Sequence, residues 1–308
     1  APPPGGPPFS PARPAMTWWQ AAILGLVQGL AEFLPISSSG HLVLGEYMLG
    51  LDTAGAGDVT FEVFVHFGTA LSILTVYRQR IGRILRDAFG ALLQPRLWAE
   101  AVRPGTIERA RGDGPDDGPP VASGDPTPSL RLVAFVLITM VPTFLGYLLF
   151  EERLEALFGD PRFVCGALIV TGILLLLTRL RPDPDGVLSP LKSVLVGIAQ
   201  TAALIPGISR SGSTICTAIY LNVDRKAAAD FSFLMLLPVV LGATLLKSLE
   251  MLETGMTVGA VPLAVGTLVA FVSGVFAIRA VQVLVQRQSL QYFAYYCFAI
   301  GIAGLVWI

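Results

Sequence analysis

The sequence predicts an all-α polytopic membrane protein, with six transmembrane helices and two re-entrant helix–turn–helix loops arranged as inverted-topology repeats. Its 308 residues are 53% hydrophobic and only 14% charged, and the mean hydropathy is +0.67. These values are too apolar for an ordinary soluble domain. The net charge of −1 argues against the basic surface that nucleic-acid binding requires. We therefore expect the membrane bilayer, and no nucleic acid, as a partner.

Six apolar runs approach the roughly 20 residues that a helix needs to cross the hydrocarbon of a bilayer. Residues 1–15 are rich in Pro and Gly, and we expect a disordered tail there. Residues 94–130 are polar with many Pro and Gly, which is typical of a long loop between spans. We expect the transmembrane helices over residues 61–77, 131–150, 163–180, 231–249, 259–281 and 291–308.

A stretch near the N-terminus recurs 172 residues later. Residues 25–41 and 197–213 are identical at seven of seventeen positions at this fixed offset. Pro35 breaks the apolar segment of the first copy, Pro206 and Gly207 break the second, and hydroxyl side chains follow each break. Broken backbone is tolerated at membrane depth only where it is buried in protein or lines a wet cavity. We therefore expect re-entrant loops over 18–51 and 193–222, within repeats that cover 16–185 and 186–308.

The charges between the spans predict how the chain crosses the membrane. Arg residues follow the first, third and fifth spans, whereas acidic residues follow the second and fourth. Because basic loops stay in the cytoplasm, the loop 94–130 is expected there. The first re-entrant loop then enters from outside and the second from the cytoplasm. Three spans after each copy give the halves opposite orientations, as in the inverted repeats of many transporters.

The second copy of the motif contains the residues expected of an anion-binding turn. Arg210 stands in a hydroxyl-rich turn at membrane depth, where its charge is costly unless a partner neutralises it. The planar guanidinium suits phosphate, and the amides of a turn that opens a helix would complete the cradle. The alternative is a structural Arg210 paired with Glu32 or with a helix C-terminus. The hydroxyls around Arg210 are those of Ser209, Ser211, Ser213 and Thr214.

The first copy supplies the groups that the second lacks. Gln28 and Glu32 are four residues apart and share one helix face. Three serines, Ser37 to Ser39, and His41 follow the break. A serine near a histidine and a carboxylate offers the groups needed for nucleophilic catalysis. The two loops are therefore predicted to be complementary halves of one site, one acidic and nucleophilic and the other cationic.

Several other polar residues lie in or next to apolar runs. His66 and Glu62 are four residues apart inside the first span, and they form either a functional site or a structural pair. Asp58 and Asp230 occupy equivalent repeat positions, and we expect both to be helix N-caps. The cysteines, Cys165, Cys216 and Cys297, are far apart in apolar surroundings, which predicts small buried hydrophobes rather than a zinc site.

These motifs resemble those of a known family. Gln28 and Glu32 followed by Pro-Ile-Ser-Ser-Ser-Gly-His over 35–41, together with Pro-Gly-Ile-Ser-Arg-Ser-Gly-Ser-Thr over 206–214, resemble the bacterial undecaprenyl-diphosphate phosphatase family of the bacitracin-resistance type. The resemblance covers the chain from about Trp18 to the C-terminus, outside the loop 94–130. The paired motifs at this spacing are specific.

The resemblance implies an integral phosphatase of the bacterial plasma (inner) membrane, acting mainly at the outer, periplasmic face. Such an enzyme removes the terminal phosphate of undecaprenyl diphosphate and so recycles the lipid carrier of cell-wall sugars. The family is expected to need a divalent cation, Mg²⁺ or Ca²⁺, with Glu32 as a metal ligand. The family motif allows Glu or Gln at its first position, and this chain has Gln28, so the motif provides a single carboxylate.

On this interpretation Ser38 is the candidate nucleophile, His41 the general acid or base, and Arg210 the group that stabilises the transferring phosphoryl. Glu32, helped by Gln28, binds the cation or polarises the attacking group. An alternative has water as the nucleophile, with Glu32 or His41 as base and Ser38 as a ligand. The residues expected to hold the substrate phosphates are Gln28, Ser37, Ser209, Ser211 and Thr214.

Two other function classes compete with hydrolysis. Inverted repeats with broken helices are typical of transporters, so the chain could instead flip a polyprenyl phosphate. Such a flippase needs Arg210 but no nucleophile or base. A structural scaffold would leave both motifs unexplained. Glycines such as Gly166 and Gly172 would allow close helix packing, which leaves a homodimer open.

Overall fold

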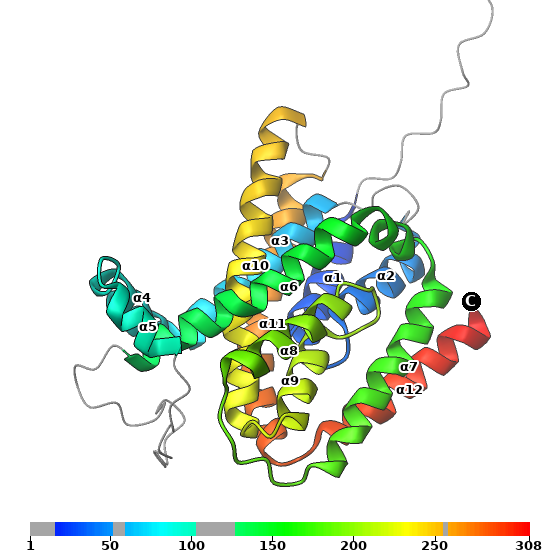
Figure 1. Cartoon of the computed structure of the whole chain (residues 1–308). Helices are drawn as coiled ribbons and strands as arrows, with labels where there is room; N and C mark the ends of the chain where they lie inside the picture. Colours follow the sequence, from blue (N-terminus) through cyan, green and yellow to red (C-terminus); the bar gives the residue numbers. More distant parts are fainter. Residues whose placement is uncertain (1–15, 52–58, 103–126, 255–257) are drawn as a thin grey trace, which may run out of the picture.

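The computed structural model describes residues 16–51, 59–102, 127–254 and 258–308, and these residues form a helical bundle (Figure 1). The predicted tail 1–15 and Asp58 lie outside the described residues. The helices are α1 (Trp18–Ala31), α2 (Ser38–Met48), α3 (Val59–Val76), α4 (Arg78–Gly90), α5 (Pro95–Val102), α6 (Thr127–Phe158), α7 (Pro161–Leu177), α8 (Pro190–Ala202), α9 (Arg210–Tyr220), α10 (Arg225–Thr254), α11 (Ala260–Gln286) and α12 (Leu290–Trp307).

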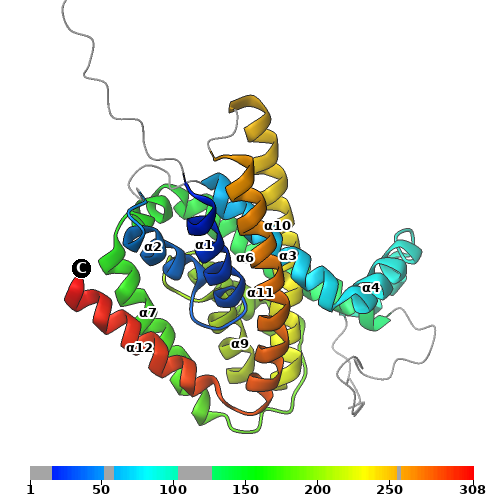
Figure 2. The same cartoon turned by 180° about the vertical axis from the view of Figure 1, so that it is seen from behind.

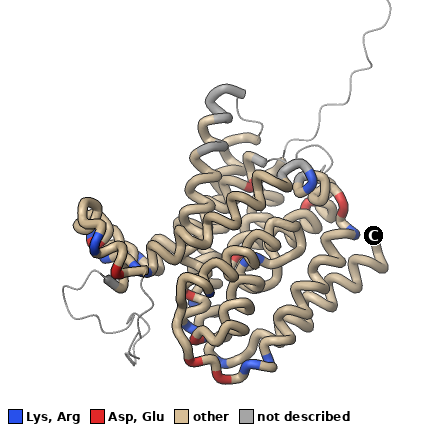
Figure 3. Tube along the Cα trace, viewed as in Figure 1, with Lys and Arg blue, Asp and Glu red and all other residues tan. Residues whose placement is uncertain are grey.

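The prediction of an all-α membrane protein is confirmed. Within the described ranges, the five helices α6, α7, α10, α11 and α12 are long and apolar enough to cross a membrane. A sixth span is counted if α3 and α4, which meet at a bend of 84°, are taken together. Figure 3 shows charged residues gathered at the helix ends and in α4 and α5, with long uncharged stretches between them.

The chain between the first two spans is more ordered than the sequence predicts. The predicted loop 94–130 contains α5 at its start and the first turn of α6 at its end, while residues 103–126 lie outside the described part. Both helices α4 and α5 lie to one side of the bundle, where α6 runs from them into it (Figure 1). In α4 no residue is buried, and its basic residues are costly in hydrocarbon.

The two broken motifs fold as predicted, each as a helix, a turn and a second helix. The four helices have 14, 11, 13 and 11 residues, and each is too short to cross the hydrocarbon alone. Each first helix packs on a long helix from the other half of the chain, α1 on α11 (Figure 2) and α8 on α6. This packing of each half against the other agrees with the predicted inverted repeat, which stays a prediction.

Glycines at equivalent repeat positions allow these two contacts. A Cβ on Gly25 of α1 would lie 2.4 Å from the carbonyl oxygen of Gly266, and a Cβ on Gly197 of α8 would lie 2.7 Å from that of Thr139. Gly172, which was considered for a homodimer contact, packs against Phe298 of α12 in the same chain, so it is not free to pack against a second copy. The three cysteines are free and buried, as predicted.

The prediction that Asp230 is a helix N-cap is wrong. Asp230 lies inside α10, where its carboxylate accepts hydrogen bonds from the Tyr77 hydroxyl at 2.7 Å and from Arg80 at 2.9 Å. Gln282 of α11 donates to the Tyr77 hydroxyl at 2.8 Å. Asp224 caps α10 instead, since its side chain accepts the Ala227 amide. The buried Asp230 is tolerated because a cation and a hydroxyl satisfy its charge.

Candidate active site

The site forms where the turns of the two broken motifs meet. Ser37 caps α2 by accepting the Gly40 amide, and Ser209 caps α9 by accepting the Gly212 amide. Ser37 has a φ of 71°, an uncommon conformation for a residue with a Cβ, and the turn of the second motif has its positive φ at Gly207 instead. A Cβ on Gly40 would lie 3.0 Å from the Gly207 Cα. The turns thus touch, and they bring both helix N-termini to one place.

An ion pair joins the two motifs. Arg210 Nη2 lies 2.9 Å from Glu32 Oε1, and the two side chains are 16% and 5% exposed. The Glu32 Oε2 atom accepts hydrogen bonds from Ser38 at 2.6 Å and from Gln28 at 2.9 Å. Glu32 follows the last turn of α1, and Ser38 and Arg210 open α2 and α9. The pairing of Arg210 with Glu32, considered above as a structural alternative, is therefore present. Ser38 bonds to the same carboxylate.

The rest of the Arg210 side chain is held by α10. Arg210 Nη1 donates to the Ser232 carbonyl at 2.8 Å, and the Thr214 hydroxyl lies 2.7 Å from the Ser232 hydroxyl. Phe33 and Phe233 pack edge to face beside this contact, with ring centroids 5.5 Å apart. The Arg210 fork is thus fixed in orientation between Glu32 and Ser232. Ser232 is a residue that the motif analysis missed, because it lies in a span outside either motif.

Burial separates the predicted hydroxyls into two groups. Ser37, Ser209, Ser211 and Thr214 are at most 2% exposed, and they bond to the turns themselves. The Ser211 hydroxyl, for example, donates to the Leu34 carbonyl at 3.2 Å. The partly exposed side chains of the site are Ser38, Ser39, His41, His66 and Arg210. The buried hydroxyls therefore stabilise the turns, whereas the partly exposed side chains lie where a ligand can reach them.

The two histidines of the chain occupy different parts of the site. His41 Nδ1 lies 2.8 Å from the Ser37 carbonyl oxygen, and its Nε2 lies 2.9 Å from the Tyr296 hydroxyl. Both ring nitrogens therefore bond away from Glu32. His66 of α3 instead has its Nε2 at 3.5 Å from Glu32 Oε2. The sequence indicated His66 as a candidate because it is an ionisable residue inside a predicted span. Nothing in the sequence indicated that Tyr296 would contact the site.

The oxygen atoms around Glu32 fit a hard divalent cation. Among the described residues, no group of three or more His, Cys, Asp or Glu side chains is placed to hold a metal ion. Gln28 Oε1 is buried beside Glu32 and has no hydrogen-bond partner there. One carboxylate, one amide oxygen, water and substrate phosphate are a usual ligand set for Mg²⁺. Glu32 and Gln28 would hold the ion.

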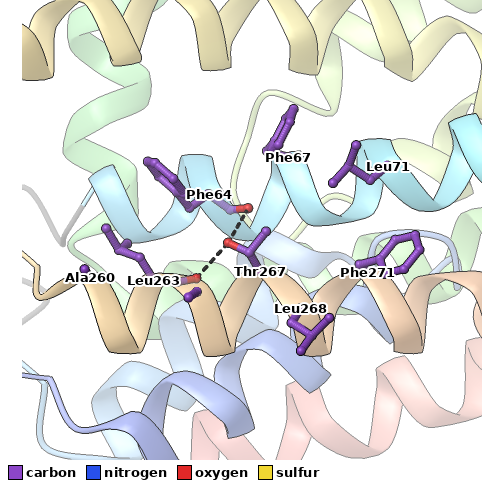
Figure 4. Close-up of a pocket in the computed structure, with 9 residues that line it drawn as sticks. Phe64, Phe67, Leu71, Ala260, Leu263, Thr267, Leu268 and Phe271 are labelled. Carbon is purple, nitrogen blue, oxygen red and sulfur yellow. Dashed lines mark hydrogen bonds between the residues drawn. The ribbon is translucent and has the colours of Figure 1, made fainter.

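An apolar groove of about 400 Å³ runs between α3 and α11. Figure 4 shows the groove lined by aromatic and aliphatic side chains, with the Thr267 hydroxyl turned to the backbone oxygens of Phe64 and Leu263. None of the described residues that line it is ionisable, so the groove is suited to hydrocarbon.

Comparisons with known proteins agree with these motifs. The family model described as bacitracin resistance protein BacA matches residues 21–303. A relative from Salinibacter ruber named undecaprenyl-diphosphatase is 54% identical over 290 residues, which cover 94% of this chain and 99% of the relative. A relative of the same name from Christiangramia forsetii is 37% identical over 294 residues, or 94% and 98% of the two chains. The chain therefore belongs to the bacitracin resistance protein BacA family.

Proposed function

We propose that this membrane protein hydrolyses undecaprenyl diphosphate with water to undecaprenyl phosphate and inorganic phosphate, and so recycles the lipid carrier of cell-wall synthesis. The observation that carries the proposal is the Glu32 side chain, which is bonded at once to Ser38 and to Arg210. A transporter of polyprenyl phosphate needs the cation but not a hydroxyl activated by a carboxylate. The names of the two relatives, undecaprenyl-diphosphatase, support the same activity.

In the proposed reaction the Ser38 oxygen attacks the terminal phosphorus while its proton passes to Glu32, 2.6 Å away. The bond from that phosphorus to the bridging oxygen breaks, and undecaprenyl phosphate leaves with the bond's electron pair. Water then attacks the phosphorus of the phosphoserine, the bond from phosphorus to the Ser38 oxygen breaks, and that oxygen takes back the proton from Glu32, which restores Ser38 and releases phosphate with the protons of the water. Arg210 stabilises the charge on the transferring phosphoryl group, and positioned charge is most of what phosphoryl transfer requires.

The remaining residues support these groups. We propose that His41 serves as acid or base, although its Nε2 must first release Tyr296. Ser37, Ser209, Ser211 and Thr214 keep the turns in place and so position Ser38 and Arg210. A divalent cation bound at Glu32 and Gln28 would neutralise charge on the diphosphate.

Phosphate release from undecaprenyl diphosphate by purified protein in detergent tests the function. We expect release by the wild type, and loss of release when a chelator removes divalent cations. No release from folded protein with Mg²⁺ or Ca²⁺ would contradict the proposal. Movement of labelled polyprenyl phosphate across vesicles by that same protein would then favour the flippase.

The groove between α3 and α11 is proposed to hold part of the prenyl chain, because its lining is apolar and α3 also brings His66 to the site. Ala264 is an exposed residue of the lining. We expect Ala264→Trp to raise KM for undecaprenyl diphosphate several-fold, at about 1 kcal/mol for a few lost methylene contacts, with little change for a short prenyl diphosphate. Equal effects on both substrates would contradict this placement.

We propose a bacterial plasma membrane location, with the site opening outward as the family resemblance implies and the spans oriented as the Arg distribution predicts. Gly159 then lies outside and Gln288 in the cytoplasm, and both are exposed. In right-side-out cells, an impermeant thiol reagent should label Gly159→Cys and leave Gln288→Cys unlabelled. The native cysteines are buried and give little background. Labelling of both sites from one side would contradict this topology.

A further inference from the structure

The orientation of the His66 ring fixes which of its nitrogens can act on the site. His66 Nδ1 lies 2.7 Å from the Glu62 carbonyl oxygen. A carbonyl only accepts hydrogen bonds, so Nδ1 carries the hydrogen. The neutral ring therefore presents a lone pair at Nε2. That lone pair lies 3.5 Å from Glu32 Oε2, which is also an acceptor.

The Gln28 amide, which bonds to the same carboxylate oxygen, carries a third acceptor. Gln28 Nε2 donates to Glu32 Oε2 at 2.9 Å. Because a carboxylate only accepts, this contact sets the orientation of the amide. Gln28 Oε1 is then left buried without a hydrogen-bond partner in the described part of the chain. His66 Nε2 and the amide that carries the unpartnered Gln28 Oε1 thus both lie next to the Glu32 carboxylate, an arrangement that a cation would stabilise.

We propose that His66 Nε2 is a ligand of the divalent cation, with Glu32 and Gln28 Oε1, which makes this a mixed nitrogen and oxygen site. This proposal rests on the cation in the proposed function. The Nδ1 bond to the Glu62 carbonyl is the partner that metal-binding histidines usually have, since it fixes the tautomer and the ring orientation. His41 is not available in the same way, because both of its nitrogens are engaged by Ser37 and Tyr296.

The proposal also gives a reason for a motif with a single carboxylate. With Gln28 in the first motif position, Glu32 is the only acidic group of the motif. An imidazole adds a neutral, stronger donor, and it favours transition metals over Ca²⁺. We therefore expect the wild type to bind Mn²⁺ more tightly than Ca²⁺, a preference that His66→Gln should reduce.

Electron paramagnetic resonance of Mn²⁺ bound to the purified protein tests the ligand directly, without substrate. The spin-echo modulation of wild-type Mn²⁺ should contain a coupling to imidazole nitrogen, and His66→Gln should remove that coupling. The Kd for Mn²⁺ should rise about tenfold or more in the variant. His41→Gln is the matched control, and it should keep the nitrogen coupling. Thermal unfolding of each variant checks that the protein is folded.

The outcomes separate this proposal from the proposed function. Wild-type Mn²⁺ without nitrogen coupling, or a coupling that survives in His66→Gln, would overturn the role of His66. The first result would favour a protonated His66 that forms only an ion pair with Glu32. Phosphate release is measured on the same samples. If wild-type protein releases phosphate but shows no nitrogen coupling, the proposed phosphatase function stands and only the proposal that His66 is a metal ligand is contradicted.

Discussion

Replacing Arg210 with Lys will lower kcat for phosphate release by about 10²–10³-fold, the usual cost of losing one positioned donor to a developing charge. Lys keeps the charge but loses the fork that reaches Glu32 at 2.9 Å and the Ser232 carbonyl at 2.8 Å together. Arg210→Ala should cost about 10³–10⁵-fold, the range for an arginine at a transferring phosphoryl group. Initial rates over a range of undecaprenyl diphosphate concentrations measure both.

Stability is the main confounding effect of the Arg210 variants. Removing one partner of a buried ion pair costs about 3–5 kcal/mol, because the other charge is left unpaired. Arg80→Lys is the matched control, since Arg80 forms a second Arg–carboxylate pair in the described part of the chain, a partly buried one with Asp230 at 2.9 Å. We expect Arg80→Lys to lower the thermal unfolding temperature with little effect on kcat. An Arg210→Lys protein within tenfold of wild-type kcat would contradict the proposed role of Arg210.

Ser38→Ala will lower kcat by about 10³-fold or more, with a smaller change in KM, if Ser38 is the nucleophile. Ser38 is partly exposed and donates to Glu32 at 2.6 Å, which orients its oxygen and provides a proton acceptor. Rapid acid quench of the wild type during turnover should trap a phosphoserine, and mass spectrometry should locate it at Ser38.

Ser39→Ala is the control for Ser38, because the Ser39 hydroxyl lies 3.4 Å from that of Ser37 and not against Glu32. This variant should still give phosphoserine at Ser38. Full activity in Ser38→Ala, or a quench that yields no phosphoserine, would make water the nucleophile. Glu32 would then be the base, and Ser38 a substrate ligand.

The sequence by itself determined the class of fold and the two motifs. Mean hydropathy and run length predict the spans because a bilayer needs apolar helices of a set length. Pro35, and Pro206 with Gly207, predict the breaks because proline removes a helical hydrogen bond and clashes with the preceding turn. The repeat predicted that Glu32, Ser38 and Arg210 would face one another, and their contacts agree with that expectation.

Tertiary structure decided which way the other side chains point. Asp230 was expected to cap a helix, yet its partners Tyr77 and Arg80 are 153 and 150 residues away. His66 was expected to form either a functional site or a structural pair with Glu62, four residues before it, but its Nε2 faces Glu32 at the end of α1. A sequence pattern reports only neighbours along one helix, whereas these contacts depend on how α1, α3 and α10 pack. Helix packing likewise buries Ser37, Ser209, Ser211 and Thr214, whose hydroxyls bond inward, and leaves Ser38, Ser39 and Arg210 partly exposed.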